Sequence, residues 1–176
     1  MKINVNAIVE FCEKVATTLP QIEHSPGVNN RFFKTDYEEF LSGTRSELEF
    51  PCMGLNFRQE SSLPGSIKSV GTNSQLRMQA CVIFAHKAES GNYAQNEARL
   101  DEMFECIIHL YDFMETRAAG PTACNYPLIE LWDIEQGVRF YSLADADIEN
   151  AVGWVMFIPL RESLIFDNKD NPLKIL

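Results

Sequence analysis

The sequence predicts an α+β fold: a two-layer sandwich in which a mostly antiparallel sheet of four or five strands carries two main helices on one face. Two observations lead to this prediction. The expected elements run helix, short helix, strand, long loop, strand, long helix and then three strands, an order typical of helices segregated to one face of an antiparallel sheet. The chain of 176 residues, 45% of them hydrophobic, can also bury a sizeable core. We expect one domain over residues 1–160 and a C-terminal arm or extra edge strand over residues 161–176.

Two segments have the spacing of amphipathic helices. In residues 4–18 apolar side chains recur every three or four positions, Asn4 or Asn6 can cap the start, and Pro20 stops the helix. The stronger pattern covers residues 92–117, where acidic side chains lie largely off a continuous apolar stripe. The stripe consists of Leu100, Met103, Phe104, Ile107, Ile108, Tyr111 and Met114.

Two strands joined by a long connection are expected between these helices. A short helix at 35–43 precedes them. Residues 47–57 predict the first strand, in which Pro51 removes a ladder donor and so indicates an edge position or a bulge. Residues 75–86 predict the second strand, which becomes apolar on both faces toward its end. The polar connection at 58–74 is rich in Ser, Gly and Pro, and loops of this length in small domains are often functional.

Three further strands complete the predicted sheet, at residues 128–134, 137–144 and 152–160. The last of them, VGWVMFIPL, is apolar on both of its alternating faces. Two helices cover only one face of a sheet, so the second face needs another cover. The candidates are the C-terminal arm, a strongly curled sheet, or another subunit. We favour another subunit, because a contiguous exposed apolar patch usually marks an interface.

The sequence contains no assembled catalytic or metal-binding motif. The three histidines, His24, His86 and His109, lie far apart, and no phosphate-binding glycine loop or nucleophile elbow is present. His109 has Glu105 and Asp112 within one helical turn, but a metal site there would lack a second histidine. We therefore expect a protein that is not an enzyme and that has no cofactor or metal. If it were a small hydrolase, these three residues would be the first candidates.

Charge and cysteine content exclude several further classes. A net charge of −10 argues against tight nucleic-acid binding, although an acidic wall suits a channel that DNA slides past. No apolar run approaches the roughly 18 residues that span a bilayer, and the N-terminus does not resemble a signal peptide. We therefore expect a cytoplasmic protein without membrane contacts. Its five cysteines include no C-x-x-C pair and are expected to be free thiols.

The predicted order of elements resembles that of phage tail terminator (tail completion) proteins. The closing DIENAVGWVMFIPL, residues 147–160, is similar to endings in that family, where a polar turn leads into a Gly-Trp or Gly-aromatic strand that is apolar on both faces. The stretch YAQNEARLDEMFECIIHLYDFM, residues 93–114, resembles the family's central helix. The resemblance covers most of residues 1–160, while the 58–74 loop and the tail after residue 160 do not match.

This resemblance implies a structural role in a phage or prophage tail, without catalysis. Family members assemble in the bacterial host as a homo-oligomeric ring, typically of six subunits, on the end of the tail tube. The ring caps the tube and docks to the head–tail connector, so the implied partners are the tail tube protein and the connector. The alternatives are another assembly or adaptor module, such as a head–tail connector or baseplate adaptor, and a small hydrolase.

A ring closed by head-to-tail contacts needs two complementary patches on each subunit, and the sequence offers two sets of candidate anchors. Large aromatic side chains and Met dominate interface energies, and those of the last strand are Trp154, Met156 and Phe157. The aliphatic side chains of the 58–74 loop, which we expect to dock on a partner, are Leu63, Ile67 and Val70. For Trp154 the alternative is simple packing under the long helix.

Overall fold

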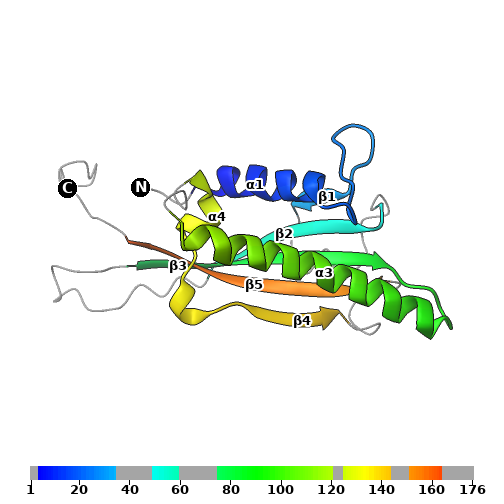
Figure 1. Ribbon diagram of the computed structural model, residues 1–176. Coiled ribbons are helices and arrows are strands. Elements are labelled where there is room, and N and C mark those ends of the chain that lie inside the picture. Colours follow the sequence, from blue (N-terminus) through cyan, green and yellow to red (C-terminus); the bar gives the residue numbers. More distant parts are fainter. Residues whose placement is uncertain (1–3, 35–48, 60–74, 121–124, 144–150, 164–176) are drawn as a thin grey trace, which may run out of the picture.

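A computed structural model describes residues 4–34, 49–59, 75–120, 125–143 and 151–163 (Figure 1). The helices are α1 (Val5–Thr18), α3 (Tyr93–Ala118), α4 (Pro127–Glu130) and the 3-10 turn η2 (Ile134–Gln136). The strands are β1 (Phe32–Lys34), β2 (Cys52–Gln59), β3 (Gln75–Lys87), β4 (Arg139–Leu143) and β5 (Ala151–Ser163). The predicted short helix at 35–43 and the 58–74 connection fall almost wholly outside the described residues.

All five strands belong to one sheet, in the order β1-β2-β3-β5-β4. Strands β3 and β5 are the longest, at 13 residues each, and they pair antiparallel from Gln75↔Ser163 to Lys87↔Ala151. Only the short β1 runs parallel to its neighbour. The last strand in the sequence therefore lies in the interior of the sheet, and the prediction of a mostly antiparallel α+β fold is confirmed.

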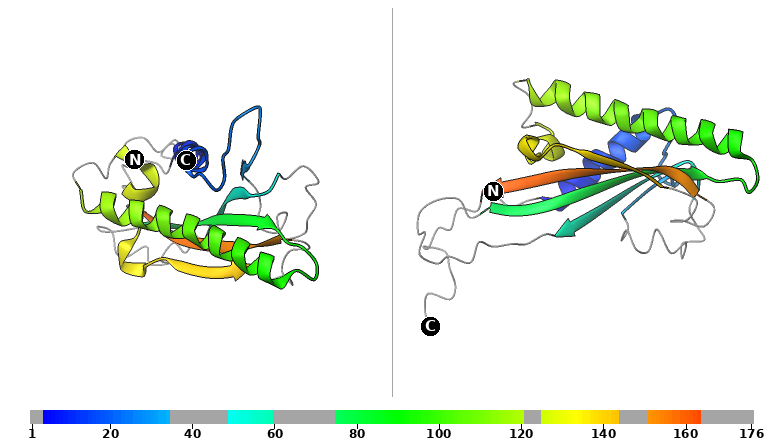
Figure 2. Two further views of the ribbon diagram at one scale, coloured as in Figure 1. Left: turned by 45° about the vertical axis from the view of Figure 1, so that its right-hand side comes forward. Right: turned by 90° about the horizontal axis from the view of Figure 1, so that it is seen from below.

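The helices pack on one face of this sheet (Figures 1 and 2). Helix α3 lies across β3 and β5, α1 lies against β1 and β2, and α4 contacts both helices. Both long helices begin at asparagine caps, of which Asn4 was one of the two expected for the first helix. The Asn4 side chain accepts a hydrogen bond from the Ala7 N–H at 3.2 Å, and the Asn92 side chain accepts one from the Gln95 N–H at 3.3 Å. Such caps satisfy backbone donors that a helix leaves unpaired at its start.

The main core fills the space between the sheet and the helices. Each large side chain fully buried there stabilises the fold by about 1.5–3 kcal/mol relative to exposure. The largest contributors from the sheet are Phe84, Met53, Leu55, Met156 and Ile158, and those from the helices are Ile8, Met103, Ile107, Met114 and Leu128.

Two predictions about the strands are wrong. Residues 128–134 do not form a strand: Pro127 begins helix α4, because its fixed φ suits the first helical turn, and only Trp132 forms an isolated bridge with Leu160. Strand β2 lies between β1 and β3 rather than at an edge. Pro51 does not disturb it because the strand begins one residue later, at Cys52.

Strand β5 continues to Ser163, three residues past the boundary expected between domain and arm. The rest of the predicted arm lies outside the described residues. In the part of the chain that is described, no helix is both long and apolar enough to cross a membrane.

Candidate functional site

Of the predicted interface anchors in β5, Met156 lies in the main core and the half-buried Trp154 packs against that core. The Trp154 indole N–H donates a hydrogen bond to the Leu100 carbonyl in α3 at 3.1 Å, and its ring lies 4.8 Å from that of Phe104. Met156 is 0% exposed. Met156 could reach a partner only if α3 left the sheet. The half-buried Trp154 packs under the long helix, which was the alternative to an interface.

The second face of the sheet, on the side away from α3, has its own smaller core. Its buried members are Phe33, Cys52, Cys81, Ile83, Ala85, Leu143, Ala151 and Val155, and the partly buried Phe50 and Phe157 pack against them. These residues are removed from solvent within one chain. The expectation that this face needs another subunit as its cover is therefore corrected.

Phe157 is the predicted anchor that lies nearest the surface on this second face. It is half-buried and packs edge-to-face against Tyr141 of β4, with ring centroids 5.5 Å apart. Tyr141 itself is 53% exposed. The other predicted anchors, Leu63, Ile67 and Val70, lie outside the described residues.

The sequence-derived catalytic candidates do not form a site in the structure. Glu105, His109 and Asp112 are all exposed on α3, and the neighbouring Cys106 points into the core at 0% exposure. Within the described ranges, no three His, Cys, Asp or Glu side chains are placed to hold a metal ion. These residues act as a solvated helix surface.

The buried thiols are also poor nucleophiles. Cys12, Cys52, Cys81 and Cys106 are all buried, and Cys12, Cys52 and Cys106 are free thiols. Burial raises the pKa of Cys12 from 9.0 to about 12 and also raises the pKa of Cys106 to about 12, because a thiolate loses its hydration there. These two thiols therefore stay protonated at neutral pH, and reactivity requires the thiolate.

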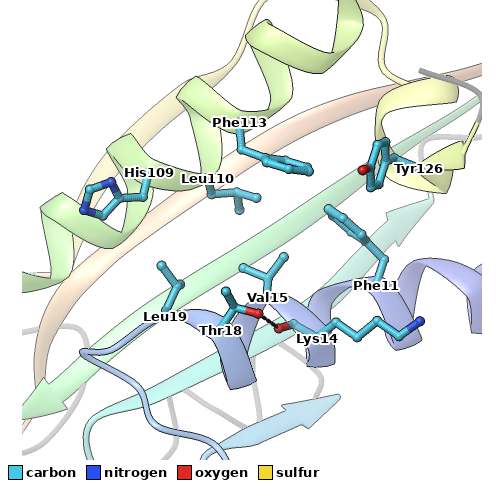
Figure 3. Close-up of a pocket in the computed structure, with 9 residues that line it drawn as sticks. All are labelled: Phe11, Lys14, Val15, Thr18, Leu19, His109, Leu110, Phe113 and Tyr126. Atoms are coloured by element: carbon cyan, nitrogen blue, oxygen red, sulfur yellow. Dashed lines mark hydrogen bonds between the residues drawn. The ribbon is translucent and has the colours of Figure 1, made fainter. Parts of the chain in front are cut away.

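The described residues form an apolar groove between α1 and α3, with a volume of about 430 Å³ (Figure 3). We call it the α1–α3 groove. Its α1 wall consists of Phe11, Lys14, Val15, Thr18 and Leu19, its α3 wall consists of His109, Leu110 and Phe113, and Tyr126 comes from the start of α4.

Three aromatic rings close one end of this groove. Phe11, Phe113 and Tyr126 point toward one another (Figure 3), with centroid separations of 5.2–6.2 Å. The guanidinium of Arg117 lies 5.5 Å from the Phe113 ring centroid and 5.8 Å from that of Tyr126. Such distances are typical of cation–π contacts, so this end carries a positive charge held on an aromatic surface.

The groove was not predicted from the sequence. The residues that could have indicated the groove are Leu110 and Phe113, which are apolar but which we did not assign to the main stripe of the long helix. The spacing of apolar residues within one helix does not show whether they are buried or line an open groove, because this depends on how far α1 lies from α3.

Comparison with protein-family models finds no match to this chain. Comparison with curated proteins finds no significant match either.

Proposed function

We propose that this chain is a structural subunit of a phage or prophage tail, which forms a homo-oligomeric ring that caps the tail tube and docks to the head–tail connector. The observation that carries the proposal is the order of elements within one sheet. An N-terminal helix, a β2–β3 pair with a long connection, a crossing helix and closing antiparallel strands follow the order of the tail terminator family. The closing strand β5 is apolar on both faces, as the resemblance implies.

The two edges of the sheet support this proposal. In the described part of the chain, β1 pairs only with β2 and β4 pairs only with β5. Their outer edges are therefore two different surfaces on opposite sides of the subunit, and a head-to-tail ring needs two such surfaces. Unpaired strand edges are natural sites for contact with another chain. The net charge of −10 suits a ring whose channel passes DNA without binding it.

The test is the solution mass, measured by light scattering behind a sizing column over a range of concentrations and at two salt levels. We expect a closed oligomer of one stoichiometry, visible as rings by negative-stain electron microscopy. A chain that stays monomeric under all these conditions and forms no rings would contradict the proposal.

A matched pair of variants locates the contact. Tyr141→Asp places a charge on the exposed side of β4, and we expect it to lower the oligomer fraction. Tyr93→Asp places the same charge at the start of α3, where the side chain is 78% exposed, and we expect the oligomer to persist. Equal effects of the two variants would argue against a contact through β4.

An assembly adaptor that binds a partner segment is the second candidate function. The α1–α3 groove favours it, since a concave apolar site with a few polar groups is a typical binding site. A monomer that binds a partner peptide in this groove would support the adaptor over the ring.

A further inference from the structure

We propose that the α1–α3 groove binds an acidic amphipathic helix of a partner protein. This inference goes beyond the ring and does not depend on it, because a ring subunit and a monomeric adaptor could each carry such a groove. Three properties of the groove lead to it: its place in the helical layer, its apolar lining, and the charges around it.

The groove occupies a gap in the helical layer. Helix α1 packs on β1 and β2, α3 packs on β3 and β5, and α4 contacts both helices (Figure 2). The volume of about 430 Å³ lies within the roughly 300–1,000 Å³ of typical binding sites. A helix lying there would place its apolar side chains between α1 and α3, a recurring way of binding amphipathic segments.

The lining provides an apolar surface with few polar groups. Phe11, Val15, Leu19, Leu110 and Phe113 supply most of it. The Thr18 hydroxyl already donates to the Lys14 carbonyl oxygen at 2.8 Å. Burial of apolar surface of this kind is the main favourable term in association.

The charges lining the groove are opposite in sign to the charge of the chain. The charged or ionisable side chains in the lining are Lys14 and His109, although the chain has 25 acidic and 15 basic residues. Arg117 adds a second positive charge at the aromatic end, beside that of Lys14. None of the three forms an ion pair with another described residue, whereas Arg99 pairs with Glu89 at 2.9 Å.

The spacing of these charges favours a helix over a fatty acid. His109 and Arg117 are eight residues apart on α3, which is about 12 Å along the helix axis, and Lys14 lies on the opposite wall. One carboxylate head group could pair with only one of them. An amphipathic helix with several Glu or Asp residues beside its apolar stripe could pair with Lys14 and Arg117 and accept a hydrogen bond from the His109 ring. Acidic side chains on the same two helices lie outside the groove lining, so they repel an acidic helix that binds elsewhere on these surfaces. They are Glu10, Glu13, Glu105 and Asp112.

The probe is a synthetic helical peptide with Leu at positions i, i+3, i+4 and i+7 and Glu at the flanking positions. Its control has the same Leu pattern with Gln in place of Glu, since a basic peptide would be attracted to the acidic chain anywhere. Fluorescence anisotropy with the full chain measures both affinities. We expect the Glu peptide to bind at least about 10-fold more tightly, with the preference reduced by added salt.

Variants connect this binding to the groove. We expect Lys14→Glu and Arg117→Glu each to weaken Glu-peptide binding by about 10-fold, and Thr18→Trp to weaken both peptides by filling the groove. Lys87→Glu is a matched control on an exposed position at the end of β3, and it should leave binding unchanged. Circular dichroism melting checks that each variant is folded.

Three results would overturn the proposal. The first is no binding of the Glu peptide, or equal binding of the Gln peptide. The second is binding that is insensitive to Lys14→Glu and Thr18→Trp, which would place the peptide elsewhere. The third is displacement of the peptide by dodecanoate at comparable affinity, which would make the groove a fatty-acid site. Light scattering on the same samples reports oligomerisation separately, so loss of the ring and loss of peptide binding are distinguishable.

Discussion

The two faces of the sheet are both apolar and buried, but different elements bury them. Helices cover the face under α1 and α3, where they pack on strand residues such as Phe84 and Met156. The buried residues of the opposite face all lie in the strands themselves, among them Cys81, Ile83 and Ala85 of β3.

Gly54 and Phe33 show one such contact within the sheet, because they are paired across β2 and β1. A Cβ atom added at Gly54 would lie 2.9 Å from the Phe33 ring, so the ring occupies the space that a side chain on β2 would fill. Alternation of apolar residues therefore indicates that a face is buried, but it does not indicate which element covers that face.

The largest effect should come from Gly153, where β5 passes closest to the backbone of β3. A Cβ added there would lie 2.0 Å from the Phe84 carbonyl oxygen and 2.8 Å from the Ala85 Cα. Backbone atoms cannot move aside, so we expect Gly153→Ala to lower the free energy of unfolding by more than about 4 kcal/mol, measured by urea denaturation. Gly54→Ala is the control: it meets a movable ring edge, and we expect a loss of about 1–3 kcal/mol. Equal losses would contradict this difference.

The next largest effect compares adjacent residues on opposite faces of β5. Met156 faces the helices and Val155 faces the second core, and both are 0% exposed. We expect Met156→Ala to cost about 2–5 kcal/mol of unfolding free energy. Val155→Ala removes fewer atoms and should cost about 1–3 kcal/mol. Chemical denaturation of both variants checks the order, and a larger loss for Val155→Ala would show that the second face is the more tightly packed.

A smaller effect concerns the pH dependence of stability. Because burial raises the pKa of Cys12 from 9.0 to about 12, the folded chain keeps this proton at a pH where the unfolded chain loses it. The free energy of unfolding should therefore fall as pH rises from about 9 to about 12, with Cys12 contributing about 1.4 kcal/mol per pH unit. Cys12→Ala should flatten the decline measured by urea denaturation at increasing pH.

Cys52 extends this pH measurement to the second face. Burial raises the pKa of its thiol, against a smaller lowering by the charge of Arg31. An equal flattening by Cys52→Ala would mean that both faces exclude water equally. No flattening by either variant would contradict the burial of these thiols.

The smallest effect concerns how α3 is held on its face of the sheet. Trp154→Phe removes the hydrogen bond to the Leu100 carbonyl and should cost about 1 kcal/mol, measured as a lower melting temperature. Trp132→Phe is the control, since within the described residues its buried indole nitrogen has no hydrogen-bond partner. If both variants lost the same stability, the hydrogen bond to α3 would not explain the loss.

The sequence predicted helices and strands well where a single apolar periodicity dominates a segment. Both long helices were predicted to within two residues, because their apolar residues recur at helical spacing; Asn4 was one of two expected caps, whereas the cap at Asn92 was not predicted. The β3 and β5 strands were also predicted, because apolar residues occupy alternating positions over long runs. In contrast, the 128–134 segment is apolar enough for a strand, but Pro127 begins helix α4 there, and α4 packs against α1 and α3.

The candidate site was less predictable than the fold. The α1–α3 groove depends on residues from three elements that are far apart in the sequence, and no local spacing predicts their distance. The interface predictions for Trp154 and Met156 rested on residue type alone, which does not distinguish a side chain facing α3 from one facing a partner. Phe33 shows the same limit: β1 has only three residues, too few for a periodic pattern.

The interior position of β5 has a consequence for synthesis. Strand β4 pairs only with β5 among the described residues, and β3 has an open edge until β5 arrives. Until residue 163 has left the exit tunnel of the ribosome, the emerging chain therefore exposes the long edge of β3. During the same time β4 lacks the strand with which it forms hydrogen bonds. Chains stalled before that point would expose unpaired strand edges, which promote aggregation. The middle of the sheet is thus the last part that can form.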